Sequence, residues 1–240
     1  MATDQSRNEA AKQEILRRIH AANAAAGKPE TAYPVPRRYV QKSPADAAGL
    51  RSEFIDRLTD YGVTVAAAKP DGVAEAIAQL VDVLGISVGG GRAAEETTAR
   101  IVYAPGLDPR LFGPLEQRGF SVTADDASTD PRTLDTASAV VTGSTVSCSQ
   151  TGTICLESGP LGGRRALSLV PDIHLCLVEE TSIVGTVPEM MAQLSQTAPV
   201  TMISGPSATS DIELERVNGV HGPRTLGVIL IAAAPGGDGQ

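Results

Sequence analysis

The amino-acid sequence predicts an α/β fold: a mixed β-sheet between helical layers, with a helical arm at the N-terminus. From residue 63 onward, short apolar segments alternate with helical patterns, which is typical of β-α-β units. The 240 residues include no Trp, three Phe and four Tyr, although 42% of the chain is hydrophobic. The core must therefore consist of aliphatic side chains, as in sheets that helices cover on both faces.

The first 62 residues are expected to form the helical arm or cap. Residues 6–26 carry apolar side chains at steps of three and four, which predicts an amphipathic helix. A second helix is expected to begin near Ser43-Pro44, because Ser is a favoured N-cap and Pro is tolerated in a first turn. Its apolar face would include Phe54 and Leu58.

The α/β domain is expected over residues 63–234, with a flexible tail over residues 235–240. Apolar runs predict strands at residues 63–66, 86–88, 101–103, 137–143, 153–156, 166–170, 173–178, 200–203 and 226–231. Periodicity predicts helices at residues 71–84, 111–118 and 187–194, and a further helix with Thr209 or Ser210 as its N-cap.

Composition excludes several classes of partner. The net charge is −8, and the sequence contains no long basic segment, so nucleic acid is not an expected partner. No segment reaches the ~20 apolar residues of a membrane span, and the polar N-terminus does not resemble a signal peptide, so no membrane insertion and a cytoplasmic location are expected. Three cysteines without a CxxC motif predict reduced thiols, no Fe–S cluster in this chain and no metal.

Small polar residues gather where the strand at 200–203 ends. Helix N-terminal N–H groups and short polar side chains converge at strand-to-helix junctions, so a ligand-binding site is expected there. The expected ligand-binding residues of this stretch are Ser204, Gly205, Ser207, Thr209 and Ser210. Helix capping explains the same residues equally well. A hydrolytic triad is not expected, because the sequence lacks the last glycine of G-x-S-x-G.

A second polar stretch, residues 142–153, is rich in Gly, Ser and Thr. It either brings backbone N–H groups to an anion or forms a hairpin connection. Thr151, Gly152 and Thr153 are its expected ligand-binding residues. His174 and His221 lie at predicted strand starts, and with Asp211 they are the candidate catalytic residues.

Five short motifs occur in one order within this half of the chain: residues 150–154, 169–174, 203–207, 209–213 and 219–223. Together they resemble the LUD-domain family, and within it the lactate-utilization subunit that has no Fe–S motifs. The resemblance implies a fold similar to ribose-5-phosphate isomerases and CoA transferases (NagB/RpiA-like). It also implies that the chain works with Fe–S partner subunits, which carry the clusters, in oxidising L-lactate to pyruvate.

Three functional hypotheses follow. The first is a subunit of a lactate-oxidising complex that binds a small carboxylate or phosphate and is not a catalyst alone. The second, suggested by the fold, is a self-sufficient enzyme for a small anionic or CoA-linked substrate. The third is an assembly or binding module without chemistry of its own.

Overall fold

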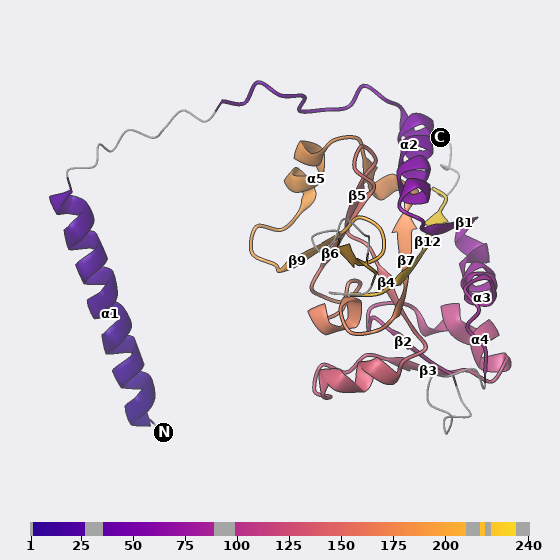
Figure 1. The fold of residues 1–240 in the computed structure, drawn as a ribbon, viewed down its shortest axis with the longest axis horizontal. Helices are drawn as coiled ribbons and strands as arrows, with labels where there is room; N and C mark the ends of the chain where they lie inside the picture. Colours follow the sequence, from indigo (N-terminus) through magenta and orange to yellow (C-terminus); the bar gives the residue numbers. More distant parts are fainter. Residues whose placement is uncertain (1, 27–35, 89–98, 210–216, 219–221, 234–240) are drawn as a thin grey trace, which may run out of the picture. The chain divides into compact units, whose positions relative to one another are not determined.

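The structure, a computed structural model, describes residues 2–26, 36–88, 99–209, 217–218 and 222–233. The chain divides into two compact units, Met1–Tyr39 and Val40–Gln240. Both large sheets lie in the second unit (Figure 1). The tail that the sequence places at residues 235–240 lies outside the described residues.

Helix α1 (Ala2–Ala25) forms where the sequence predicts the first helix. An ion pair joins Glu14 to Arg17 one turn further along, and pairs at this spacing stabilise a helix. On the same helix the apolar side chains of Ile15 and Ile19 are 58% and 48% exposed. Helix α1 of the first unit therefore carries exposed apolar side chains.

A six-stranded parallel sheet forms the centre of the second unit. Its strands, in spatial order, are β1 (Thr64–Ala68), β12 (Thr225–Ile231), β7 (Ile173–Glu179), β4 (Ala139–Gly143), β2 (Arg100–Tyr103) and β3 (Ser121–Ala124). All neighbouring strands run parallel. The central strands β4, β7 and β12 are buried on both faces, which explains their nearly continuous apolar sequences.

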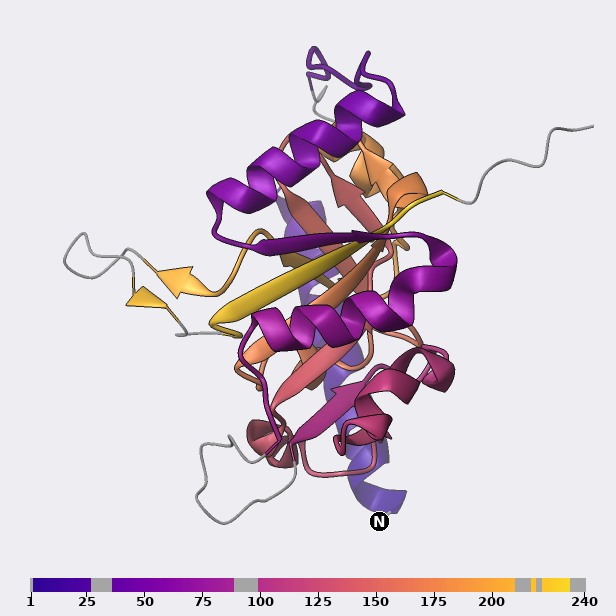
Figure 2. The same ribbon diagram turned by 90° about the vertical axis from the view of Figure 1, so that its right-hand side faces the viewer.

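Helices cover one face of this sheet. They are η1 (Pro70–Gly72), α3 (Val73–Val83), η2 (Pro109–Phe112) and α4 (Gly113–Gln117). Helix α3 lies along β1 and β12 (Figure 2). Leu175 and Ile229, from neighbouring strands, share one buried cluster with Ile77 of α3. At Gly227 an added Cβ would lie 3.0 Å from Leu80 Cδ2, so the glycine lets α3 pack closely on the sheet.

Helix α2 (Ala47–Asp60) and a second sheet cover the opposite face. The second sheet contains, in spatial order, β8 (Ile183–Val184), β5 (Val146–Cys148), β6 (Thr153–Glu157) and β9 (Val200–Ile203). Phe54 and Leu58 of α2 are fully buried in a cluster with Val228 of β12 and Ile154 of β6. The α/β class and the helical layers are therefore as predicted. Helix α2, which the sequence places in the arm, belongs to the same compact unit as the sheets.

The chain passes from the first sheet to the second directly, since β4 is followed by β5 after two residues. The N–H groups of this crossing are used within the fold: Gly143, Ser144 and Thr145 donate to the carbonyls of Leu161, Leu177 and Cys155. Strand β5 then pairs antiparallel with β6. The polar stretch 142–153 is thus a hairpin connection, the second of the two alternatives that its sequence leaves open.

Further short helices and a small ribbon also belong to the second unit. They are η3 (Pro131–Thr136), η5 (Glu180–Ser182), α5 (Val187–Gln193), and the antiparallel pair β10 (Ala208–Thr209) and β11 (Val217–Asn218). Helix α5 lies where the sequence predicts it. Its N-cap Thr186 and Glu189 form a capping box, and Glu189 also accepts a hydrogen bond from Ser43 N at 3.2 Å.

Two expected elements are wrong. Residues 166–170 do not form a strand: a 3-10 helix, η4 (Arg165–Ser168), occupies most of them. Residues 86–88 follow the helix end at Gly85, where φ is +71°, and join neither sheet. Thr209, one of the two expected N-caps of a further helix, lies in β10, which pairs with β11, and the helix expected after it lies outside the described residues.

Candidate functional site

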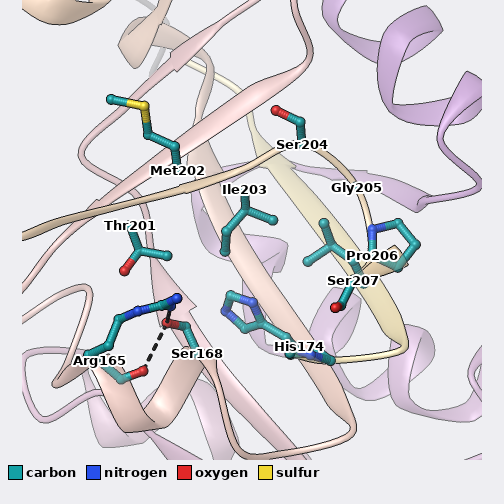
Figure 3. A pocket seen from close by; sticks show the side chains of 13 residues that line it. Arg165, Ser168, His174, Thr201, Met202, Ile203, Ser204, Gly205, Pro206 and Ser207 are labelled. Carbon is teal, nitrogen blue, oxygen red and sulfur yellow. Dashed lines mark hydrogen bonds between the residues drawn. The ribbon is translucent and has the colours of Figure 1, made fainter. Parts of the chain in front are cut away.

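A cavity of about 240 Å³ lies beside the amino ends of β7 and β12, against the chain that follows β9. Four segments line it: Arg165 and Ser168 of η4, His174 of β7, Thr201 to Ser207, and Gly222, Pro223 and Leu226. Figure 3 shows Arg165 and Ser168 on one side, the arc from Thr201 to Ser207 across from them, and the His174 ring between. The site thus joins residues far apart in the sequence.

Arg165 supplies the cavity's charge. It is the one charged residue among the described residues of the lining, and no described carboxylate forms an ion pair with it. Its Nη1 donates to Ser168 Oγ at 3.3 Å, and that hydroxyl donates back to the Arg165 carbonyl at 3.3 Å. A guanidinium with further N–H donors favours a carboxylate or phosphate as its partner.

A buried ion pair fixes the helix that carries Arg165. Arg164, the N-cap of η4, donates to both carboxylate oxygens of Asp125, at 2.8 and 3.0 Å. The side chains of Asp125 and Arg164 are only 4% and 19% exposed. Such a bidentate, shielded pair holds one geometry, so η4 keeps Arg165 and Ser168 at the cavity wall.

His174 supplies a neutral ring. Its side chain is 1% exposed, and burial lowers the pKa of His174 from 6.5 to about 4, so the imidazole is neutral at pH 7. Nε2 lies 2.8 Å from Thr142 Oγ1 on the neighbouring strand β4. Nδ1 has no hydrogen-bond partner among the described residues. A buried polar atom without a partner is rare in folded proteins and marks a place where a ligand could complete the bonding.

A chain of hydroxyl groups leads from the β5–β6 turn to the cavity. Thr151 Oγ1 lies 2.7 Å from Thr153 Oγ1, which lies 2.8 Å from Ser204 Oγ. The hydroxyl of Tyr61, the C-cap residue of α2, donates to the Thr151 carbonyl at 3.3 Å. The turn between β5 and β6 is therefore tied both to α2 and to the cavity wall.

Two glycines allow α2 to approach this wall. Gly205 has φ +85°, and an added Cβ would lie 2.6 Å from Tyr61 Cβ. Gly152 has φ +60°, and its added Cβ would lie 2.8 Å from Arg57 Cβ. Both positions combine a left-handed backbone with a close contact, which only glycine satisfies without strain.

The structure brings together four of the predicted site residues. His174, Ser204, Gly205 and Ser207 line the cavity. Thr151, Gly152 and Thr153 lie behind Ser204 in the adjoining turn. The backbone of Thr209 lies in β10, and Ser210, Asp211 and His221 lie outside the described residues.

Sequence reasoning missed Arg165, Ser168 and Thr142. The pair Arg164-Arg165 after Gly162-Gly163 is a readable signal, because arginine is over-represented where proteins bind carboxylates and phosphates. The apolar pattern of residues 166–170, however, predicts a strand and not a binding site.

A second cavity, of about 230 Å³, lies at the carboxyl ends of β4, β7 and β12. Ligands often bind at that edge of a parallel sheet. Its lining is mostly leucine and other apolar residues, with Ser144 and Glu179 as polar members. Burial raises the pKa of Glu179, and no described cation lines this cavity. The first cavity, which contains Arg165, is therefore the better binding site for an anion.

Neither a metal cluster nor a membrane-spanning helix is found among the described residues. The three cysteines are buried thiols, and burial raises the pKa of Cys155 to about 11 and that of Cys176 to about 12. The thiols of Cys155 and Cys176 are therefore protonated at pH 7, so these two are poor metal ligands as they stand.

Comparison with known proteins places the chain in a family. The family model of the LUD domain matches residues 51–231. Lactate utilization protein C of Deinococcus radiodurans is 39% identical over 92% of this chain and 95% of its own length. The protein of the same name from Bacillus subtilis is 31% identical over 45% of this chain and 48% of its own. A crystal structure of a DUF162 family protein from Deinococcus radiodurans matches with a TM-score of 0.60 and 34% identity, over 78% of this chain and 99% of that one.

The matched region contains both sheets, α3 to α5 and every described residue that lines the first cavity. The motifs that suggested the family from sequence also lie within it. This chain belongs to the LUD-domain family.

Proposed function

We propose that this chain is the subunit without Fe–S clusters in a system that oxidises L-lactate to pyruvate, and that its first cavity binds a small carboxylate or phosphate. Relatives named lactate utilization protein C support the first part, and one of them is similar over nearly the whole chain. The cation Arg165, which forms no ion pair with any carboxylate that the structure describes and lies at the wall of a cavity that also contains His174, carries the second part.

Oxidation of L-lactate to pyruvate releases two electrons and two protons. Three cysteines are fewer than the four that usually ligate an Fe–S cluster, so we place the electron-accepting clusters on partner subunits. Arg165 would hold the substrate carboxylate through its N–H groups. The neutral ring of His174 offers a nitrogen that can orient or accept a proton beside it.

Growth of a strain that lacks this gene tests the proposal. Supplied with the wild-type chain, the strain should grow on L-lactate as sole carbon source, and with Arg165→Gln it should grow at least tenfold more slowly. Arg110→Gln is the matched control, because Arg110 is 90% exposed and pairs with Asp108 away from the cavity. Equal growth of the strain without any copy would refute the proposed role.

A pure assembly module is the second candidate function, and helix α1 favours it. Ile15, Leu16 and Ile19 expose apolar surface on one helix, as helices that dock on a partner do. This function predicts that Arg165→Gln leaves lactate oxidation intact while charged residues at positions 15 and 19 abolish complex formation. Loss of activity with an intact complex would exclude it.

A further inference from the structure

The second cavity is built on one face of the parallel sheet. Gly143 of β4 lies opposite Leu177 of β7 in the register of these strands, and Glu179 of β7 lies opposite Ile231 of β12. Directly opposed residues, and residues two apart on one strand, point to the same face of a sheet. All four line the cavity, and Val73 at the start of α3 lines it from the helical layer.

Gly143 leaves space in this cavity. A glycine within a strand weakens the strand and often marks a place where another group approaches the backbone closely. An added Cβ would lie 3.4 Å from Leu161 Cβ and 3.6 Å from Leu107 Cδ2, and both leucines line the cavity. These are ordinary van der Waals contacts, and Gly143 has no left-handed backbone, so the fold itself accepts alanine here. The missing side chain therefore adds room between two leucines that the backbone conformation does not require.

Glu179 supplies the charge of the second cavity. It is the one charged residue among the described residues of the lining, and Ser144 is neutral. The other side chains are apolar and belong to Pro70, Val73, Leu107, Leu111, Leu161, Leu177 and Ile231. Partial burial raises the pKa of Glu179, and no described cation acts against this effect. A cation bound beside the carboxylate would favour its charged form, whereas an anion would repel it.

The volume of the cavity limits the size of its ligand. One water occupies ~30 Å³ in the liquid, so about 230 Å³ holds roughly eight non-hydrogen atoms. An aliphatic chain that replaces water along the leucines gains hydrophobic free energy. Because Glu179 is exposed as well as part of the lining, a cationic group bound to it would remain near water. The ligand that fits both ends is a short apolar chain with one terminal cation.

We propose that the second cavity binds a primary alkylammonium ion of about four to six carbons, with its chain among the leucines and its ammonium group on the Glu179 carboxylate. The inference goes beyond the proposed function and does not depend on it. It concerns the carboxyl ends of β4, β7 and β12 and a cation, whereas the proposed function concerns the amino ends of β7 and β12 and an anion.

Calorimetry on the full chain at pH 7.5 tests the charge of the ligand with three compounds of equal chain length. Pentylamine is a cation at this pH, 1-pentanol is neutral and pentanoate is an anion. We expect pentylamine to bind about tenfold more tightly than pentanol, and pentanoate to bind more weakly than either, because only the amine offers a charge opposite to that of Glu179. Pentanoate binding as tightly as pentylamine would overturn the inference, as would absence of measurable pentylamine binding.

A series from ethylamine to pentylamine separates the cavity from the acidic surface of the chain. Inside an apolar cavity each added methylene should tighten binding roughly threefold to fourfold, since each one leaves water. An ammonium ion held only by surface carboxylates would show no dependence on chain length. Equal affinity along the series would therefore overturn the inference.

Two variants locate the charged end of the site. Glu179→Gln should remove the preference for pentylamine over pentanol while pentanol still binds, because the apolar lining is unchanged. Glu116→Gln is the matched control, since Glu116 is exposed on α4 and does not line the cavity. It should keep the wild-type preference. Equal loss of preference in both variants would assign the effect to the net charge of the chain and overturn the role of Glu179.

Gly143→Ala locates the apolar end. The added methyl group would stand between Leu107 and Leu161, so pentylamine should bind at least fivefold more weakly, while the melting temperature stays equal or rises. Wild-type affinity in a folded Gly143→Ala variant would place the ligand elsewhere and overturn the inference. If this variant fails to fold, Leu161→Trp takes its place, because Leu161 is 48% exposed and a larger side chain there need not disturb the core.

A lysine side chain carries the same alkylammonium group as a free amine. Nα-acetyl-lysine methylamide, added as a further compound, distinguishes the two sources. Binding as tight as that of pentylamine assigns the cavity to a lysine of a partner protein, and binding of pentylamine alone assigns it to a free amine. Both results support the inference, and neither bears on whether the chain is required for lactate oxidation.

Discussion

At the scale of single residues, Gly205 decides whether the cavity wall can form. Its φ of +85° strains any L side chain, and an added methyl group would lie 2.6 Å from Tyr61 Cβ. Gly205→Ala should therefore lower the free energy of unfolding by roughly 2 to 4 kcal/mol, since it combines backbone strain with overpacking. Urea unfolding at constant temperature measures the loss.

Gly113→Ala is the matched control for that substitution. Gly113 has a helical φ of −50°, and an added Cβ would meet no atom within 4 Å. Alanine at such a position should leave stability unchanged or raise it by about 0.5 kcal/mol. Equal losses in the two variants would show that the contact with Tyr61 is not what requires glycine at 205.

His174 should make stability depend on pH. Burial lowers its pKa from 6.5 to about 4, so between these values the unfolded chain binds a proton that the folded chain does not. Stability is then complete above pH 6.5 and falls as the pH drops toward 4, by roughly 2 to 3 kcal/mol at pH 4.5.

Chemical unfolding at pH 7 and pH 4.5 checks this, with His174→Gln as the reference because it cannot titrate. The wild-type chain should lose more stability between the two pH values than the variant does. If both lose the same amount, other groups cause the acid destabilisation and His174 does not remain neutral when buried.

The sequence predicts those site residues whose amino-acid type alone suggests a role in ligand binding or catalysis. His174, Ser204, Gly205 and Ser207 follow or begin apolar strands, where polar residues and glycine stand out, and all four line the cavity. Arg165 could not be found in the same way. Its importance arises from its place at the cavity wall without an ion pair to any described carboxylate, which is a property of the folded chain.

At the scale of secondary structure, the start of α5 joins two distant segments. Thr186, the N-cap, is 6% exposed, and its hydroxyl donates to the Gln41 carbonyl at 3.1 Å. It also accepts from Glu189 N at 3.4 Å. The helix is therefore capped by a residue that also fixes the chain leading into α2.

Thr186→Ala should reduce the free energy of unfolding by about 1 to 2 kcal/mol, because it removes both the helix cap and the hydrogen bond from Thr186 to the Gln41 carbonyl. Thr186→Ser keeps the hydroxyl and should cost less than half as much. Denaturant midpoints of the three proteins measure the order wild type, Ser, Ala. A serine variant as unstable as the alanine variant would assign the effect to the lost methyl group instead.

Secondary structure could be predicted where one hydrophobic period, that of a helix or of a strand, dominates the sequence. The prediction failed where tertiary contacts determine the local structure. The core strands β4, β7 and β12 and the helices α3 and α5 lie within a few residues of their predicted bounds. The apolar residues 166–170 read as a strand, yet most of them lie in η4, whose N-cap Arg164 pairs with Asp125. The sequence does not predict the pairing of Thr209 with Val217 either. Neither contact is visible in local sequence.

At the scale of the whole molecule, the sheets and the described lining of the first cavity belong to one of the two units. All described residues that line the first cavity lie in the unit Val40–Gln240. Helix α1 in the unit Met1–Tyr39 contributes no residue to either sheet. The aliphatic composition predicts a sheet that helices cover on both faces. The second sheet, which covers one face together with α2, could not be predicted, because its short strands depend on pairing across the fold.

Removal of residues 1–39 should therefore leave the remaining unit folded and able to bind its ligand. The melting temperature and the affinity for L-lactate should both match those of the full chain, and only association with partner subunits should weaken. A melting temperature lowered by several degrees would show that the first unit contributes to the stability of the second.

Lactate-dependent reduction of a dye by the purified Fe–S partner subunits, with and without this full-length chain, tests the central claim most directly. We predict that reduction requires the chain and that Arg165→Gln abolishes most of it while the complex still assembles. Equal rates in the presence and absence of the chain would contradict the claim that it is a working subunit of lactate oxidation.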